Sequence, residues 1–250
     1  MRYFIELSYN GKAYHGWQIQ PNAISVQEVL EKGLSTLLRE PISTMGAGRT
    51  DAGVHAKQLF AHFNTEVNFD IPQTIYKLNS FLPVDIAIKN IFKVKADAHA
   101  RFHAISRQYL YRIALEKSPF NTEQAFLLKP KLDIEKLKTA TRILLDYEDF
   151  QCFSKSNTDV KTYNCNIMKA EWQVIDNELH FTIKADRFLR NMVRAIVGTL
   201  INIGIGKVEV ESLHTIIKSK NRSQAGFSVP GHALYLTEVE YPQTIKLDIE

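Results

Sequence analysis

The chain has 250 residues, of which 45% are hydrophobic and 23% charged, and its net charge is +4. These proportions are typical of a globular protein of one or two domains with a buried core, and they exclude a disordered chain. The longest apolar run, residues 195–206, is too short to span a bilayer, and Glu6 interrupts the N-terminal stretch where a signal peptide would be apolar.

The two cysteines, Cys152 and Cys165, lack the C-x-x-C spacing and the histidine partners of a zinc site. We interpret them as free thiols in a reducing compartment. Together with the absence of an apolar span or leader, they predict a soluble cytoplasmic protein with no membrane association.

The positive charge is concentrated in one segment. Seven basic and two acidic residues lie between Lys89 and Lys117, which gives this stretch a charge of +5 and the remainder −1. Such a segment is typical of a surface that binds a polyanion, although a solvated charged face has the same composition.

The first part of the chain alternates strands and helices. Alternating polarity predicts a strand over residues 3–9. Ser25 and Glu28 form a capping box that begins an amphipathic helix, which ends before Pro41. The other elements predicted up to residue 104 are a strand over 57–63, a helix over 70–82 and a strand over 84–94.

The second part roughly repeats this order. Its predicted elements are a strand over 107–115, a helix from its Asp133 cap to Leu145, a hairpin of strands 161–174 and 178–185, a long helix over 187–203, a short helix over 210–217 and a strand over 234–239. No linker rich in Pro, Gly or Ser separates the two parts. We therefore predict an α+β fold in which two halves share one mostly antiparallel sheet with helices on one face.

A glycine-rich loop, residues 46–56, lies between the first helix and the next strand. Its three glycines disfavour a helix and favour a shaped loop. Asp51 stands two residues from Arg49, whose guanidinium is expected to lower the pKa of the carboxyl group and keep it ionised at neutral pH. An ionised Asp51 suits a nucleophile or an electrostatic stabiliser, and the alternative is a structural aspartate that closes its own turn.

Three other groups are candidates to act with Asp51. On the strand over 107–115, Tyr109 can stack on a nucleobase, or it can belong to the core together with Tyr111. The predicted helix over 187–203 places three arginines on one side without an intervening acid, so they need solvent, phosphate or an acidic partner such as Asp51. These arginines are Arg187, Arg190 and Arg194. The polar loop over 150–157 either contacts phosphate or has no ligand.

Metal and phosphate-loop chemistry are disfavoured. His99 and His103 stand at i and i+4, but a cation lies between them and no third ligand is evident. The glycine-rich loop lacks the Walker lysine. We predict no metal and no cofactor.

Residues 48–56, Gly-Arg-Thr-Asp-Ala-Gly-Val-His-Ala, resemble the active-site signature of the TruA family of tRNA pseudouridine synthases. The resemblance covers most of the chain, and the further similar motifs are 14–18, 98–104 followed by Arg107 and Tyr109, 149–153, 188–194 and 231–236. Two positions depart from the family pattern: Ala233 replaces a glycine, and Arg190 stands where relatives often have histidine.

The resemblance implies an isomerase that converts uridine to pseudouridine at tRNA positions 38 to 40, in the anticodon stem-loop, without cofactor or metal. It implies a homodimer, with two ferredoxin- or RRM-like halves per chain, residues 1–104 and 105–250, and a catalytic cleft between the halves. Asp51 would be the nucleophile on uridine, Tyr109 would stack on the target base, and Arg49 and Arg194 would hold or neutralise Asp51. Candidates for contacts to the RNA backbone are Arg101, Arg107, Arg187 and Arg190.

Two other classes of function are alternatives to an isomerase. A catalytically silent RNA-binding module could use the same basic surface, but the intact Asp51 argues against it. A phosphate-loop enzyme is disfavoured by the missing Walker lysine. Whether Asp51 attacks C6 of the base or C1′ of the ribose stays open.

Overall fold

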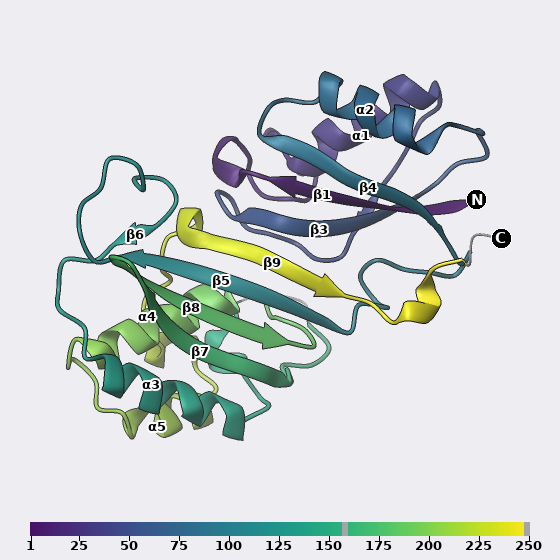
Figure 1. The fold of residues 1–250 in the computed structure, drawn as a ribbon. Coiled ribbons are helices and arrows are strands. Elements are labelled where there is room, and N and C mark those ends of the chain that lie inside the picture. Colours follow the sequence, from purple (N-terminus) through teal and green to yellow (C-terminus); the bar gives the residue numbers. More distant parts are fainter. Residues whose placement is uncertain (157–159, 248–250) are drawn as a thin grey trace. The chain divides into compact units, whose positions relative to one another are not determined.

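The computed structural model describes residues 1–156 and 160–247, shown in Figure 1. The chain forms two compact units, one of residues 1–105 with the C-terminal segment from Tyr235 onward and one of residues 106–234. Each unit consists of a sheet with helices packed against it.

The first unit is built on a mostly antiparallel sheet. Its strands, in the spatial order β4-β1-β3-β9, are β4 (Ile86–Val94), β1 (Arg2–Tyr9), β3 (His55–Asn64) and β9 (Leu234–Glu240), and β2 (Met45–Gly46) pairs with β3. Strand β1 is antiparallel to both neighbours, whereas β9 runs parallel to β3. Helices α1 (Val26–Leu38) and α2 (Ile71–Phe81) lie together on one side of these strands (Figure 1).

Local capping fixes where the helices of this unit begin. The Ser25 hydroxyl accepts a hydrogen bond from the Glu28 N–H at 3.2 Å, which confirms the predicted start of α1. Asp70 accepts one from the Gln73 N–H at 2.7 Å at the start of α2. Helix α1 ends at Leu38 because Arg39 takes a left-handed conformation, with φ of 59°.

The strands of the second unit are also mostly antiparallel. They are β5 (Ser106–Ala114), β8 (Glu178–Ala185) and β7 (Ile167–Ile175), in the order β5-β8-β7, and β6 (Phe126–Leu127) runs parallel to β5. Helices α3 (Ile134–Ile143), α4 (Met192–Gly204) and α5 (Ser212–Lys218) lie on one side of these strands (Figure 1). The predicted α+β class, with mostly antiparallel strands and helices on one face, is therefore confirmed in each unit.

Two predicted elements of the second unit are wrong in extent. The long helix begins at Met192 and not at residue 187, because Asn191 takes a left-handed conformation with φ of 67°. Only Arg194 of the three predicted stripe arginines is therefore helical. The strand predicted over 161–174 begins at Ile167, since the preceding residues pair with 148–150, where the Phe150 N–H donates to the Tyr163 carbonyl at 3.1 Å.

Both cysteines are free and buried, as predicted. Burial raises the pKa of the Cys152 thiol and of the Cys165 thiol to about 12, so neither is a reactive thiolate at neutral pH. Within residues 1–156 and 160–247, no helix combines the length and apolarity that crossing a membrane requires.

Candidate active site

The loop that carries Asp51 connects β2 to β3 in the first unit. Its start is fixed to the sheet, since the Ala47 N–H donates to the Phe60 carbonyl at 2.7 Å. Its end is a turn, in which the Val54 N–H donates to the Asp51 carbonyl at 3.2 Å and Gly53 has a φ of 76°. Asp51 itself is half-buried. The loop is therefore shaped and held by main-chain bonds, as its glycines predict.

The end of β1 and the residues that follow it, together residues 9–17, hold the Asp51 loop on both sides of the aspartate. The Tyr9 and Thr50 hydroxyls are 2.8 Å apart and hydrogen-bonded. The Trp17 N–H donates to the Thr50 carbonyl at 3.3 Å, and the Gly53 N–H donates to the Tyr14 carbonyl at 3.2 Å. These contacts fix the residue before Asp51 through both its side chain and its backbone.

The close approach of the two segments requires glycine at Gly16. Its φ is 93°, and a Cβ atom there would lie 2.2 Å from the Thr50 carbonyl oxygen. Gly46 similarly leaves room for the buried Trp17, because a Cβ atom would lie 2.4 Å from the indole nitrogen. The motif over 14–18 thus packs directly against the Asp51 loop, a contact that the sequence does not reveal.

His55, at the start of β3, has a structural role in the same region. It is buried, its Nδ1 accepts a hydrogen bond from the Gly11 N–H at 3.0 Å, and its ring stacks on Tyr235 with centroids 4.6 Å apart. Because Nδ1 accepts, the proton of the neutral ring is on Nε2. His55 therefore anchors the segment that holds the Asp51 loop.

Arg49 is not paired with Asp51 among the residues that the structure describes, although the two are only two positions apart in the sequence. Its side chain is exposed and makes no hydrogen bond or ion pair, with Asp51 or otherwise, within the described part of the chain. It is available to a ligand outside the folded unit.

Tyr109 and Tyr111 on β5 have different environments. Tyr111 is buried, its hydroxyl donates to the Pro230 carbonyl at 3.1 Å, and burial raises its pKa above the ordinary value. Tyr109 is half-buried, with its ring edge-on to Phe188 at a centroid distance of 5.1 Å. Tyr111 is thus a core residue, while Tyr109 keeps part of its surface outside the core.

Arg194, in the first turn of α4, is held by the segment over 226–229. Its Nε donates to the Val229 carbonyl at 2.7 Å, and the Val229 N–H donates back to the Arg194 carbonyl at 3.2 Å. The same segment is fixed further along α4, where the Gly226 N–H donates to the Thr199 hydroxyl at 2.7 Å. The orientation of this guanidinium is therefore set by the fold.

The four candidates for backbone contacts divide into two pairs. The guanidinium of Arg107 donates to the Asp186 carbonyl at 2.8 Å, and that of Arg187 donates to the Thr162 carbonyl at 3.3 Å, so both have structural contacts. Arg190 is exposed. Arg101 is also exposed and lies over the ring of Phe102, 5.6 Å from its centroid.

The polar loop over 150–157, for which the sequence leaves open a phosphate contact or no ligand, makes mostly structural contacts. Phe150 and Phe153 are fully buried, with ring centroids 6.3 Å apart. Asp149 forms an ion pair with Lys220 at 2.7 Å. Burial by itself would raise the pKa of Asp149, but the bonds from Lys220 and the Gln151 N–H lower it. Residue 157 lies outside the described residues.

A histidine pair holds the motif over 98–104. His62, on β3, is 8% exposed, and its Nδ1 accepts a hydrogen bond from the Ala100 N–H at 3.1 Å. The His99 ring meets the His62 ring edge-on at 4.6 Å. Burial, with His99 and Arg2 nearby, lowers the pKa of His62 to about 4, so the neutral ring is the folded form.

We expect this histidine to make the first unit less stable in acid. Because the pKa of His62 is depressed on folding, its stabilisation is complete above the unfolded-state value of about 6.5 and declines as the pH falls toward 4. The expected loss is about 2 kcal/mol between pH 8 and pH 5. Urea unfolding at both pH values checks this, with His62→Asn, which keeps an acceptor but cannot titrate, as the control. An equal pH dependence in the variant would contradict the assignment.

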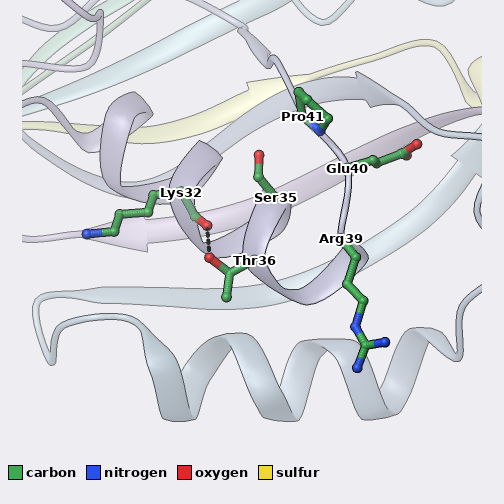
Figure 2. A pocket seen from close by; sticks show the side chains of 6 residues that line it. All are labelled: Lys32, Ser35, Thr36, Arg39, Glu40 and Pro41. Atoms are coloured by element: carbon green, nitrogen blue, oxygen red, sulfur yellow. Dashed lines mark hydrogen bonds between the residues drawn. The ribbon is translucent and has the colours of Figure 1, made fainter.

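A shallow hollow of about 490 Å³ lies elsewhere on the first unit (Figure 2). Its lining is the last turns of α1 and the residues that follow, namely Lys32, Ser35, Thr36, Arg39, Glu40 and Pro41. Ser35 accepts from the Ile42 N–H at 2.9 Å and Glu40 accepts from the Thr65 hydroxyl. These polar groups fix the end of the helix, so the hollow is not the candidate active site.

Comparison with known proteins identifies relatives of this chain. A family model described as tRNA pseudouridine synthase matches residues 141–242. The chain is 53% identical over 246 residues to the tRNA pseudouridine synthase A of Bacteroides fragilis, with 98% of each chain covered. It is 52% identical to that of Bacteroides thetaiotaomicron, with 98% of this chain and 92% of the relative covered, and 36% identical to that of Bacillus subtilis, with 96% and 99% covered.

The two α+β units, the glycine-rich Asp51 loop and these identities together define a pseudouridine synthase, an isomerase. Because about half of all positions are identical over almost the whole length, the chain belongs to the tRNA pseudouridine synthase A family. The resemblance seen in the sequence motifs is confirmed.

Proposed function

We propose that this chain converts uridine to pseudouridine at positions 38 to 40 of the tRNA anticodon stem-loop, with Asp51 as the nucleophile. Family membership supports the coarser part, the isomerisation of uridine in tRNA. The observation that carries the residue assignment is the loop around Asp51, which is fixed through Thr50 on one side and Gly53 on the other. A fixed carboxylate is what nucleophilic attack on a positioned base requires.

The reaction needs few chemical groups. The N1–C1′ glycosidic bond breaks, the detached uracil turns and a C5–C1′ bond forms. The hydrogen at C5 leaves as a proton, and N1, which has lost its bond to C1′, takes up a proton from solvent. Asp51 adds covalently to the substrate and leaves again, either at C6 or at C1′. No electrons are gained or lost overall, so the atoms balance without a co-reactant.

The remaining roles concern substrate binding. Tyr109, half-buried against Phe188, would stack on the target base, and the anchored Arg194 and exposed Arg49 would neutralise the Asp51 charge. Flipping a base out of a stem costs a few kcal/mol, which contacts between cations and phosphates offset. Arg101, Arg107, Arg187 and Arg190 are the proposed sources of those contacts.

We further propose that the enzyme is a cytoplasmic homodimer. The family resemblance supports the dimer, and the two free cysteines support a reducing compartment such as the cytoplasm. Analytical ultracentrifugation of the purified chain tests the dimer: a sedimenting mass near 28.6 kDa, the mass of one chain, at micromolar concentration would contradict it.

Tritium release from tRNA labelled with [5-³H]uridine tests the proposed reaction and its position. A tRNA with uridine at 38, 39 or 40 is expected to release one equivalent of tritium per such uridine. The matched tRNA with cytidine at all three positions is expected to release none. Release from the cytidine tRNA would reject the position, and tight binding without any release would favour a catalytically silent RNA-binding module.

A further inference from the structure

The pair of hydroxyls at Tyr9 and Thr50 links the end of β1 to the residue directly before Asp51. Their oxygens are 2.8 Å apart, and the two residues are 41 positions apart in the sequence. Tyr9 is 4% exposed, so its ring is fixed in the core of the first unit and stacks against Trp17 at a centroid distance of 6.5 Å. The hydroxyl of Thr50 is therefore bonded to a rigid partner.

The backbone of Thr50 is held as well. Its carbonyl accepts a hydrogen bond from the Trp17 N–H at 3.3 Å. Gly16 packs closely against the same carbonyl, since a Cβ atom at this position would lie 2.2 Å from the carbonyl oxygen. With the carbonyl and the hydroxyl both bonded, the rotation of the peptide that leads into Asp51 is restricted. A carboxylate one residue further on then has few orientations.

We propose that Tyr9 and Thr50 are positioning residues for the reaction, which act by orienting Asp51. This inference rests on the proposed function, because it requires Asp51 to react with the substrate. Neither hydroxyl needs to touch the substrate. The pair lowers the cost of bringing the carboxylate into the reactive geometry, which is a contribution to kcat and not to substrate binding.

Three variants test the pair without removing Asp51. Tyr9→Phe deletes one hydroxyl and keeps the buried ring, Thr50→Val deletes the other and keeps its shape, and Thr50→Ser keeps the hydroxyl. We expect kcat, measured by tritium release under steady-state conditions, to fall about tenfold in the first two, with KM changed less than about twofold. Thr50→Ser is expected to stay within about twofold of wild type.

The double variant and an unrelated tyrosine separate positioning from general destabilisation. If the two hydroxyls act as one pair, Tyr9→Phe with Thr50→Val loses no more than either alone. Tyr147→Phe removes the hydrogen bond of 2.7 Å between the Tyr147 hydroxyl and His214 in the second unit, and it is expected to leave kcat unchanged. An unchanged kcat in Tyr9→Phe and Thr50→Val, fully additive losses, or an equal loss in Tyr147→Phe would overturn the inference.

Asp51→Ala in the same assay distinguishes a failure of the proposed nucleophile from a failure of the positioning role. If Asp51→Ala still turns over, the proposed nucleophile is wrong, and the positioning role fails with it. If Asp51→Ala is inactive while the Tyr9 and Thr50 variants react at the wild-type rate, the nucleophile stands and only the positioning role is rejected.

Discussion

Replacement of Asp51 by alanine is expected to abolish pseudouridine formation, with a loss on the order of 10⁴-fold or more, while tRNA binding stays within about threefold of wild type. The loop should keep its shape, because it is held by main-chain groups of Ala47, Gly53 and Val54 that alanine at position 51 leaves in place. Only the carboxylate that we propose as the nucleophile is lost. Tritium release and filter binding, measured on the same preparations, check both halves of the prediction.

Asp97→Ala is the matched control for this experiment. Asp97 is an exposed carboxylate of the same unit, with no hydrogen bond or ion pair among residues 1–156 and 160–247, so its removal should change neither rate nor affinity appreciably. Turnover near the wild-type rate in Asp51→Ala would reject the nucleophile. A parallel loss of binding and activity would instead assign Asp51 a role in maintaining the loop.

Much of the fold could be predicted because its signals are local. The caps at Ser25, Asp70 and Asp133 lie next to the helices they begin, and the side chain of each accepts a backbone hydrogen bond from the residue three positions later. Apart from the start of β7 at Ile167, the strands also stand where their polarity indicates. The start of α4 could not be predicted, because the apolar period continues back to Phe188 and nothing in the sequence shows that Asn191 takes a left-handed conformation.

The candidate site shows the same division. Its glycine content and the spacing of Arg49 and Asp51 identify the loop from sequence, but the hydroxyl of Tyr9 reaches Thr50 across 41 residues and has no local signal. Arg194 is likewise fixed by Val229, 35 residues away. Sequence therefore indicates the candidate residues of the site, whereas the contacts that orient them depend on tertiary packing.

The close packing of the 226–229 segment on α4 predicts a severe defect in Gly198→Ala. A Cβ atom at Gly198 would lie 1.8 Å from the Phe227 carbonyl oxygen, which is backbone and cannot rotate away. The segment is tied to α4 on both sides of Phe227, through Gly226 and Val229. Alanine would ordinarily favour a helix over glycine by about 1 kcal/mol. The clash outweighs that gain, and we expect a net loss of about 3 kcal/mol in the free energy of unfolding.

The same substitution is expected to lower activity, because moving the segment displaces the Val229 carbonyl that holds the Arg194 guanidinium. Gly33→Ala provides the control, since Gly33 is also a buried helical glycine, but its Cβ atom would meet only side-chain atoms, at 3.1 Å on Leu82, 3.4 Å on Leu78 and 3.5 Å on Phe81. Those ends can shift, so this variant should unfold within about 1 kcal/mol of wild type. Guanidinium unfolding and tritium release of both variants decide the matter. Equal stability of the two variants would show that the 226–229 segment moves away at no cost, and would contradict the predicted clash.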